Sequence, residues 1–528
     1  MATIIQSKSG NHIYLYESES YREGDKVKNR RRIIGKVDPE TGERIFKPEY
    51  LEEKGIDAFA KEGASQAQRL YSANDIRHSK VKEYGVFYLL DEIAKQIGLT
   101  QILTKTIPDA YNEILNLAFY IVATGEPALY CEDWLYKTEH YPSKTLSSQR
   151  ISELLLSLTP GERNAFFESW SEHRCESEYI ALDITSISTY SEQISSAEWG
   201  YNRDKENLPQ VNICLLLGEK SRLPILQVVY NGSIKDVSTL KNTLQLASNL
   251  NLDNMSLVMD KGFASTKNIQ AMMKPESKLR FLTALPFNMT FAKNQVESEC
   301  PDIDCIENTI SIGSDVLRGI AKERTWNGNP IYAHVYLNPE EATRAKNKLY
   351  AKIQRFTDQV RKDPQAHLDS ADVKKYLIVR KSAKEPLGYT LSVRHEVAKT
   401  ELSHAGWLIL VSNHIRNARE AIEIYRDKDV VEKGFQYMKN CLDLARLRVH
   451  SDSAMHNKVF IGFIALILTA HIHNTMHTHA LYEKWTLKKM LKILERMKVH
   501  YVKNDRIVSP LSKDQKRIFR AFSLKPDL

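Results

Sequence analysis

Five short apolar runs, rich in β-branched residues, follow one another between residues 178 and 287 and constrain the fold more than any other feature. Their sequences are EYIALDITSIS, VNICLLL, PILQVVY, MSLVMD and LRFLTALPF, and the helical stretches DVSTLKNTLQLASNL and STKNIQAMMK separate the later runs. Three strands in succession, followed by strands and helices in alternation, predict a mixed sheet covered by helices. The expected fold class is α/β for this region, within a multidomain chain that is α+β overall.

Length and composition narrow the class of protein. A chain of 528 residues, with 42% hydrophobic and 27% charged residues, is typical of a globular protein with about two to four domains. The six cysteines form no regular framework, and the N-terminus lacks the pattern of a signal peptide. The longest apolar stretch, Val459–Ala470, is shorter than the roughly 20 residues that cross a bilayer. We therefore expect a cytoplasmic protein without membrane contact.

Changes of pattern along the chain predict five segments. Residues 1–75 form an N-terminal β-hairpin region, 76–177 a helical region, 178–287 and 404–480 the α/β domain, 288–403 a strand-rich insertion, and 481–528 a basic C-terminal tail. In the helical region, two short helices meet at Thr159-Pro160-Gly161. Such a pair would either enter the major groove of DNA or form a plain packing unit, so this region is a candidate for binding DNA ends.

Basic residues gather in the first and the last of these segments. The cluster of Lys28, Arg30, Arg31 and Arg32 would either meet phosphate groups or keep an edge strand soluble. The tail holds nine Lys and four Arg against five acidic residues. Its net charge is therefore +8, the same as the net charge of the whole chain. It would either follow a phosphate backbone or pack on the preceding domain as an amphipathic helix.

Two aspartates follow apolar strands of the predicted sheet. Asp183 comes directly after Tyr179–Leu182, and Asp260 comes directly after Leu257–Met259. An ionised carboxylate at such a place is costly unless it is paired or binds a metal ion. Ligands of open α/β sheets gather at the carboxyl ends of strands, although an aspartate there also serves as a helix cap or turn former.

A third acidic residue lies on a helix predicted over residues 415–440. At about 100° per residue, Tyr425, Lys428, Glu432 and Lys439 fall within an arc of roughly 60° on that helix. The carboxylate would bind a metal ion while the two lysines and the phenol hold phosphate oxygens. The alternative is a solvated face on which Lys428 and Glu432 pair as i, i+4 neighbours.

The three acids together predict a catalytic site for phosphoryl transfer. Asp183, Asp260 and Glu432 are both the candidate catalytic residues and the candidate metal ligands. Carboxylate oxygens suit Mg²⁺, or Mn²⁺ in its place, and two ions would activate the attacking oxygen and stabilise the departing one.

Several motifs around these residues resemble one family. LDITS contains Asp183, MDKGF contains Asp260, GYNRD spans Gly200–Asp204, and Tyr425, Lys428, Glu432 and Lys439 have the spacing of a Tyr-Arg-Glu-Lys signature. The sequence resembles the DDE-type bacterial insertion-sequence transposases of the insertion-sequence-four superfamily, which have a ribonuclease-H-like catalytic domain. Lys428 stands where that signature has arginine, so a point charge replaces a planar bidentate group.

The resemblance implies an activity and partners. A DNA transposase of this kind cleaves strands at the element's ends, and the freed 3′-hydroxyl attacks target DNA. Expected partners are terminal inverted repeats, target DNA and a second copy in a homodimeric synaptic complex, and the protein would associate with the nucleoid. The alternatives are a metal-dependent nuclease of the same fold without strand transfer, and a domesticated DNA-binding protein without catalysis.

Six residues are candidates for contact with DNA. They are Tyr425, Lys428, Lys439, Arg446, Arg448 and Trp326. Arg446 and Arg448 would either touch the DNA backbone or pair with surface acids. Trp326 lies in the insertion, where some relatives use an aromatic residue in forming a DNA hairpin; the alternative for Trp326 is a core anchor.

Overall fold

The computed structural model describes residues 3–9, 12–24, 26–38, 44–53, 77–174, 179–202, 204, 206–249, 256–274, 279–299, 301–382, 388–441, 446–503 and 505–526. Contacts divide the chain into two compact units. The first contains residues 1–81 and 500–510 with 527–528, and the second contains residues 82–499 and 511–526.

The first unit contains an antiparallel sheet in the order β1-β2-β3-β4. Its elements are β1 (Thr3–Ser9), β2 (His12–Glu23), β3 (Lys26–Val37), β4 (Arg44–Phe46) and the helix α1 (Pro48–Glu53). Leu15, Ile34 and Tyr50 form its small core. In the region predicted to form β-hairpins, the alternating sequences HIYLYESESYR and KVKNRRRIIGKV lie in β2 and β3. The turn-like sequence Asp38-Pro39-Glu40-Thr41-Gly42 lies outside the described residues, except for Asp38.

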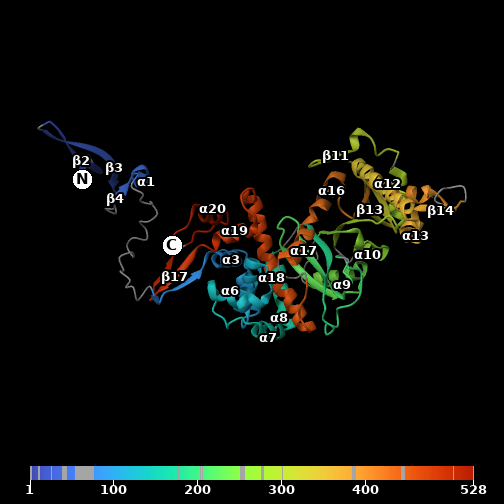
Figure 1. The fold of residues 1–528 in the computed structure, drawn as a ribbon, viewed down its shortest axis with the longest axis horizontal. Helices are drawn as coiled ribbons and strands as arrows, with labels where there is room; N and C mark the ends of the chain where they lie inside the picture. The colour runs from blue at the N-terminus through green and yellow to red at the C-terminus, as the bar shows by residue number, and fades with distance from the viewer. Residues whose placement is uncertain are drawn as a thin grey trace. The chain divides into compact units, whose positions relative to one another are not determined.

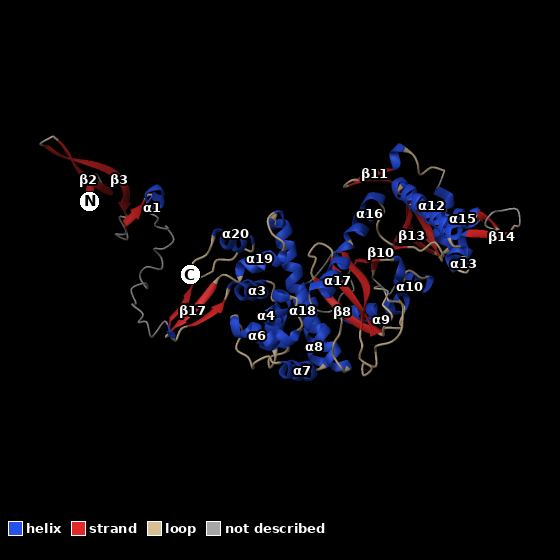
Figure 2. Ribbon diagram, in the orientation of Figure 1, coloured by secondary structure: helices blue, strands red, loops and turns tan. Residues whose placement is uncertain are grey.

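A helical region follows, as predicted. It contains α3 (Gly85–Gln96), α4 (Leu99–Thr106), α5 (Tyr111–Thr124), η2 (Ala128–Tyr130), α6 (Cys131–Lys137), α7 (Ser148–Ser157) and α8 (Pro160–Arg174), after the short strand β5 (Lys80–Glu83). The long helix α18 (Asp452–Thr478) packs against α3, α5 and α7 (Figures 1 and 2). By length and composition α18 could cross a membrane, but 78% of its most apolar window is buried inside the protein, which is typical of a core helix.

The two helices predicted around Thr159-Pro160-Gly161 are confirmed as α7 and α8. Both pack on other elements: α7 on α18, and α8 on α4 and on the strand β8 (Pro224–Asn231). Trp170 of α8 is buried, and its Nε1 donates to the carbonyl oxygen of Pro224 at 2.9 Å. The pair therefore joins the helical region to the sheet, as a packing unit does.

The second unit is built on a nine-stranded mixed sheet, so the predicted α/β fold class is confirmed. Its strand order is β11-β12-β13-β16-β10-β9-β6-β7-β8. The strands are β6 (Tyr179–Ser188), β7 (Gln210–Gly218), β8, β9 (Ser256–Met259), β10 (Arg280–Ala284), β11 (Thr309–Ile312), β12 (Asp315–Trp326), β13 (Asn329–Leu337) and β16 (Trp407–Ser412). The five runs predicted as strands are β6 to β10, and α9 (Asp236–Asn249), η3 (Lys261–Phe263) and α10 (Thr266–Met272) lie between the later ones.

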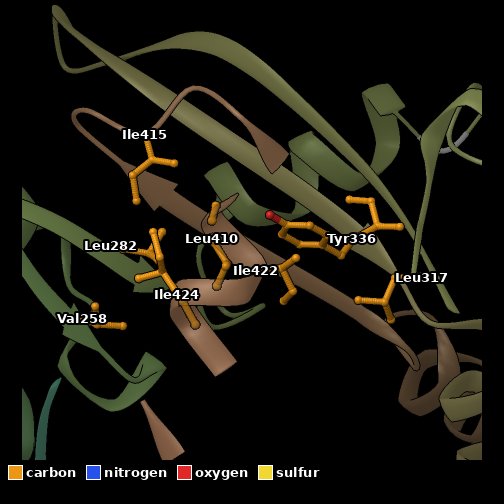
Figure 3. Packing of buried hydrophobic residues seen from close by; sticks show 11 residues of the cluster. Val258, Leu282, Leu317, Tyr336, Leu410, Ile415, Ile422 and Ile424 are labelled. Atoms are coloured by element: carbon orange, nitrogen blue, oxygen red, sulfur yellow. The ribbon is translucent and has the colours of Figure 1, made fainter. Parts of the chain in front are cut away.

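Strand directions within this sheet are those of a ribonuclease-H-like core. β6, β7 and β8 are antiparallel neighbours, whereas β9 runs parallel to β6 and β10 runs parallel to β9. The insertion extends the same sheet, because β13 pairs with β16 and β16 pairs with β10, both antiparallel. The buried cluster in Figure 3 joins the two parts: Val258 and Leu282 come from the core strands, and Leu317 and Tyr336 from the insertion.

The rest of the insertion has a core of its own. It contains α11 (Thr290–Glu299), η4 (Ile306–Asn308), α12 (Pro339–Lys362), α13 (Pro364–His367), α14 (Ala371–Tyr376), β14 (Leu377–Lys381), β15 (Tyr389–Val393) and α15 (His395–Leu402). The sequence KKYLIVRK, residues 374–381, predicts a strand over its whole length, but this is wrong at its start, because residues 374–376 end α14. Val373 and Tyr376, three residues apart, are both buried in this core. Residues three apart lie on the same face of a helix, so a helix buries both side chains here.

The single helix predicted over residues 415–440 is also wrong in detail. Two helices, α16 (Ala418–Asp427) and α17 (Asp429–Cys441), meet at Lys428. Asn417 begins α16, since its side chain accepts from the amides of Arg419 and Glu420. Lys428 is only 6% exposed, so the junction turns a charged side chain into the protein.

The basic tail folds rather than extends. Its elements are η5 (Leu481–Glu483), α19 (Leu487–Leu494), β17 (Lys498–Val502), β18 (Asp505–Val508) and α20 (Lys513–Ala521). α19 packs on α3 and α20, and Gln515 Nε2 donates to the carbonyl oxygen of Ile493 at 3.0 Å. The structure therefore shows the packing alternative, and contact between the tail's basic side chains and DNA stays a prediction.

We predict that Asn457→Ala destabilises the second unit by about 2–4 kcal/mol, because two buried carbonyls lose their donor. Asn457 is fully buried on α18, and its Nδ2 donates to the carbonyl oxygens of Leu155 at 2.8 Å and Leu158 at 2.9 Å. Its Oδ1 accepts from Arg163. Urea unfolding measures the change. The matched control is Gln149→Ala, which removes an exposed amide of α7; an equal loss in both variants would contradict the prediction.

Candidate active site

Asp183 and Asp260 are brought together by the parallel pairing of β6 and β9. Leu182 lies opposite Met259 in that pairing. Asp183 follows Leu182 in the sequence, and Asp260 follows Met259. Neighbouring strands are about 4.8 Å apart, so the two carboxylates start from adjacent positions. Asp260 follows the end of β9, as predicted. Asp183 does not end its strand, because β6 continues to Ser188 along its antiparallel neighbour β7.

Asp260 sits among groups that favour its charged form. Tyr425 donates from Oη to Asp260 Oδ1 at 2.8 Å. Burial raises the pKa of Asp260, but the charge of Lys428, the backbone amide of Lys261 and the Tyr425 hydroxyl together hold it below the ordinary value. The carboxylate is therefore ionised at neutral pH in spite of its partial burial.

Tyr425 and Lys428 both lie beside Asp260. Lys428 Nζ lies 5.5 Å from the centroid of the Tyr425 ring. Burial first, and then the charge of Asp260, raise the pKa of Tyr425 far above its ordinary value, so the phenol remains a hydrogen-bond donor. Because Lys428 is buried beside Asp260, the alternative of a solvated Lys428–Glu432 pair does not describe this helix. On the exposed side, Lys433 pairs with Asp429 at 3.2 Å.

Glu432 faces the same cavity as the two aspartates. It is exposed on the first turn of α17. A cavity of about 440 Å³ is lined by Asp183, Ile184, Thr185, Asp204, Asp260, Gly262, Phe263, Glu432, Phe435, Gln436 and Lys439. The structure thus gathers all three predicted acids and one predicted cation around one hollow.

The chemistry of this donor set fits a divalent ion. Three carboxylates supply the oxygen ligands that Mg²⁺ and Mn²⁺ prefer. Within the described parts of the chain, however, no group of three or more His, Cys, Asp or Glu side chains is close enough to hold a metal ion as it stands. The residue types and their shared cavity are therefore the observations that favour a metal site.

Asp204 is a residue of this cavity that the sequence did not single out. It pairs with Lys439, Nζ to Oδ2, at 2.6 Å. Asn202 shapes the loop, because its Oδ1 accepts from the amides of Asp204 at 2.8 Å and Glu206 at 3.2 Å. Gly200 lets the loop approach the sheet, since a Cβ there would stand 2.0 Å from the carbonyl oxygen of Gly232. The GYNRD motif, which contains Asp204, could have pointed to this residue, but the motif did not predict that Asp204 lies beside Lys439.

The second acid of the loop is paired in the same way. Glu206 forms an ion pair with Arg446, and the guanidinium of Arg446 lies 5.7 Å from the ring centroid of Tyr190. The Arg446 side chain lowers the pKa of Glu206. Arg446 and Arg448 both line a second cavity of about 810 Å³ beside Glu192. For Arg446 the structure therefore shows pairing with an acid, and contact with DNA stays a prediction.

Trp326 lies away from this group, at the end of β12. It is 5% exposed, and its ring centroid is 4.5 Å from that of Phe291. Its indole nitrogen has no hydrogen-bond partner among the described residues. This packing is that of a core anchor, and a role of Trp326 in DNA hairpin formation stays a prediction.

A ribonuclease-H-like sheet with acids on its first and fourth strands and on a later helix defines the DDE class. The chain matches the family described as "Transposase DDE domain" over residues 175–468, which is more than half of its length. The protein belongs to this family. The matched range contains Asp183, Asp260 and Glu432, together with the whole loop that carries Asp204.

Similarity to other known proteins is remote. A cryo-EM structure of the piggyBac transposase synaptic complex with hairpin DNA has 10% sequence identity to this chain and a TM-score of 0.35. The match covers 83% of this chain and 73% of that one. No curated protein matches the sequence.

We predict that Lys428→Met raises the pKa of Asp260, because burial then acts without the charge that offsets it. A carboxylate whose folded pKa is lowered adds stability above its unfolded pKa of about 3.9 and loses it as the pH falls through the folded pKa. The variant should lose about 3 kcal/mol near pH 7 and less below pH 4. Urea unfolding without divalent ions between pH 3 and 7 measures this.

The matched control is Lys433→Met, which removes an exposed lysine of α17 that pairs with exposed Asp429. It should change stability by less than about 1 kcal/mol at any pH. A loss in Lys428→Met that does not depend on pH would show that Lys428 acts by packing rather than by its charge.

Proposed function

We propose that this protein is a DNA transposase that cleaves strands at the ends of its element and joins the freed ends to target DNA. The observation that carries the proposal is the cavity that Asp183, Asp260 and Glu432 share with Lys439. Membership of the transposase DDE domain family supports the same class of reaction. In the cleavage step, water attacks a phosphodiester at the element's end, and the 3′-oxygen leaves as a free 3′-hydroxyl. In the joining step, that 3′-hydroxyl attacks a phosphodiester of the target DNA, and the target's own 3′-oxygen leaves.

The side chains around the cavity have separate tasks in this proposal. The three carboxylates hold a divalent ion, Mg²⁺ or Mn²⁺, and two such ions would stabilise negative charge on the phosphoryl oxygens. Tyr425 and Lys428 fix the position and the ionised state of Asp260. Lys439, at the rim, is the group that reaches a DNA phosphate, and it must leave Asp204 to do so.

The partners in the proposal are terminal inverted repeats and target DNA, held by two copies of the chain in a synaptic complex. Arg446 and Arg448 line the second cavity, and in this proposal they contact the DNA backbone there. Because its substrate in this proposal is chromosomal DNA, we expect the protein in the cytoplasm, associated with the nucleoid. The buried state of α18 supports a protein without membrane contact.

We predict that Glu432→Gln lowers strand cleavage by about 100-fold or more, because a metal ligand contributes several kcal/mol to the transition state. DNA binding should remain, since the fold and the basic residues are unchanged. The measurement uses labelled duplexes that carry the DNA flanking the gene, with Mg²⁺, and follows cut and joined products. Glu423→Gln, on the exposed side of α16, is the matched control and should keep full activity.

The products of the same assay decide between the candidate functions. Joined products from the wild-type chain support a transposase. Cleavage without joining would leave a nuclease of the same fold, and binding without cleavage would leave a DNA-binding protein. Unchanged cleavage in Glu432→Gln would show that the catalytic residues lie elsewhere.

We predict that Asp204→Asn strengthens DNA binding about two- to fivefold, because Lys439 no longer has to break an ion pair. Glu192→Gln is the matched control: it removes an acid beside Arg446 that lines the neighbouring cavity, without touching Lys439. Fluorescence anisotropy with a labelled duplex measures both affinities. The gain should vanish when Asp204→Asn is combined with Lys439→Gln; a gain that survives there would come from net charge alone.

A further inference from the structure

The strands β2 and β3 continue beyond the small core of the first unit as a two-stranded ribbon. The pairing of β1 with β2 ends at Ser18, and the pairing of β4 with β3 begins at Gly35. Beyond Ser18 and Arg31, five cross-strand pairs lead to the tip without a further strand beside them among the described residues (Figure 1). The described side chains of residues 19–22 and 27–33 are exposed.

A ribbon of this kind is marginally stable in water by itself. The cross-strand register divides its side chains between two faces, because residues directly opposite each other point to the same side. We call one side the arginine face, with Ser18, Ser20, Arg22, Val27, Asn29 and Arg31. We call the other the mixed-charge face, with Glu17, Glu19, Tyr21, Lys28, Arg30 and Arg32.

On the mixed-charge face, acidic residues of β2 lie opposite basic residues of β3. Glu17 lies opposite Arg32, and Glu19 lies opposite Arg30. Arg32 pairs with Glu17 at 3.2 Å and with Glu53 of α1 at 2.7 Å. Opposite charges directly across a strand pair stabilise the pairing, so this face holds the ribbon together.

The arginine face is built differently. It carries no acidic residue, and Arg22 and Arg31 have no ion-pair partner within the described residues. Ser20 Oγ donates to Asn29 Oδ1 at 2.5 Å, which leaves the amide nitrogen of Asn29 as a donor at the surface. Arginine, asparagine and serine are the side chains that read base edges in the major groove.

We propose that the β2–β3 ribbon enters the major groove of DNA with the arginine face toward the base edges. The groove is about 12 Å wide and admits a two-stranded ribbon. Five paired residues extend about 17 Å, enough to follow roughly five base pairs. Arg22 and Arg31 bind guanine edges or flanking phosphates, and Asn29 binds adenine. The inference rests on the proposed function only for DNA as the partner, and needs none of the catalytic chemistry.

The test compares two double variants of the full chain that lose the same charge from opposite faces. Arg22→Gln/Arg31→Gln changes the arginine face, and Lys28→Gln/Arg30→Gln changes the mixed-charge face. Anisotropy with a random-sequence 30-base-pair duplex is measured over a range of salt concentrations. The arginine-face variant should bind about 10- to 100-fold more weakly, and its salt slope falls by up to about 1.8. The mixed-charge variant should change affinity by less than about threefold.

A further variant separates base reading from charge. Ser20→Ala/Asn29→Ala keeps the charge of the ribbon, so its salt slope should equal that of the wild type. Its preferred sequences, selected from a library of random duplexes, should differ from those of the wild type. Equal melting temperatures of all the variants show that the first unit remains folded.

The outcomes distinguish this inference from its rivals. Equal losses from the two faces would show that the ribbon adds only general charge, and no loss from either would show that it does not touch DNA. Either result overturns the inference. Pairing of an open strand edge with another protein chain would respond to neither face and would change the oligomeric state. If the wild-type chain binds DNA through the arginine face but does not cleave it, the proposed function is overturned. The inference about the ribbon is then still supported.

Discussion

The parallel pairing of β6 with β9 is the constraint on which the candidate site depends. It sets Leu182 opposite Met259, and the residues that follow them are the two aspartates. Their backbone positions are fixed by a buried sheet rather than by loops, and a slip of one residue would turn either side chain to the other face. The antiparallel neighbour β7 keeps Asp183 inside a strand, where Leu215 is its cross-strand partner.

The burial of Lys428 follows from the same constraint. Two carboxylates at adjacent strand positions repel each other, and partial burial adds to the cost of keeping Asp260 ionised. The junction between α16 and α17 turns Lys428 into the protein, where its charge offsets that cost. Tyr425 adds a donor to the same carboxylate. An arginine at this position would bring a planar group of five donors into this space, whereas the compact ammonium of lysine needs less room.

The sequence predicted the elements better than their long-range connections. The five strands were predictable because each is a short apolar run, and Glu432 because helical spacing groups it with Tyr425 and Lys439. The burial of Lys428 at the junction of two helices was not predictable from helical spacing. Spacing gives the direction in which a side chain points from the helix, but not how deeply it is buried. Nor was the extension of the sheet by β13 predictable, because its pairing with β16 joins residues far apart in the sequence, such as Val335 and Ile409, which are 74 positions apart.

The missed role of Asp204 has the same cause: its contact with Lys439 spans 235 residues, and no local pattern reports it. That contact also bears on the order in which DNA would be bound. Lys439 and Arg446 are held by acids of one loop, whereas Arg22 and Arg31 have no ion-pair partner among the described residues. Unpaired cations attract phosphate without breaking a contact, while paired ones exchange one anion for another. First contact is therefore favoured at the cations of the ribbon, and the cations at the candidate site become available only to DNA that displaces their acidic partners.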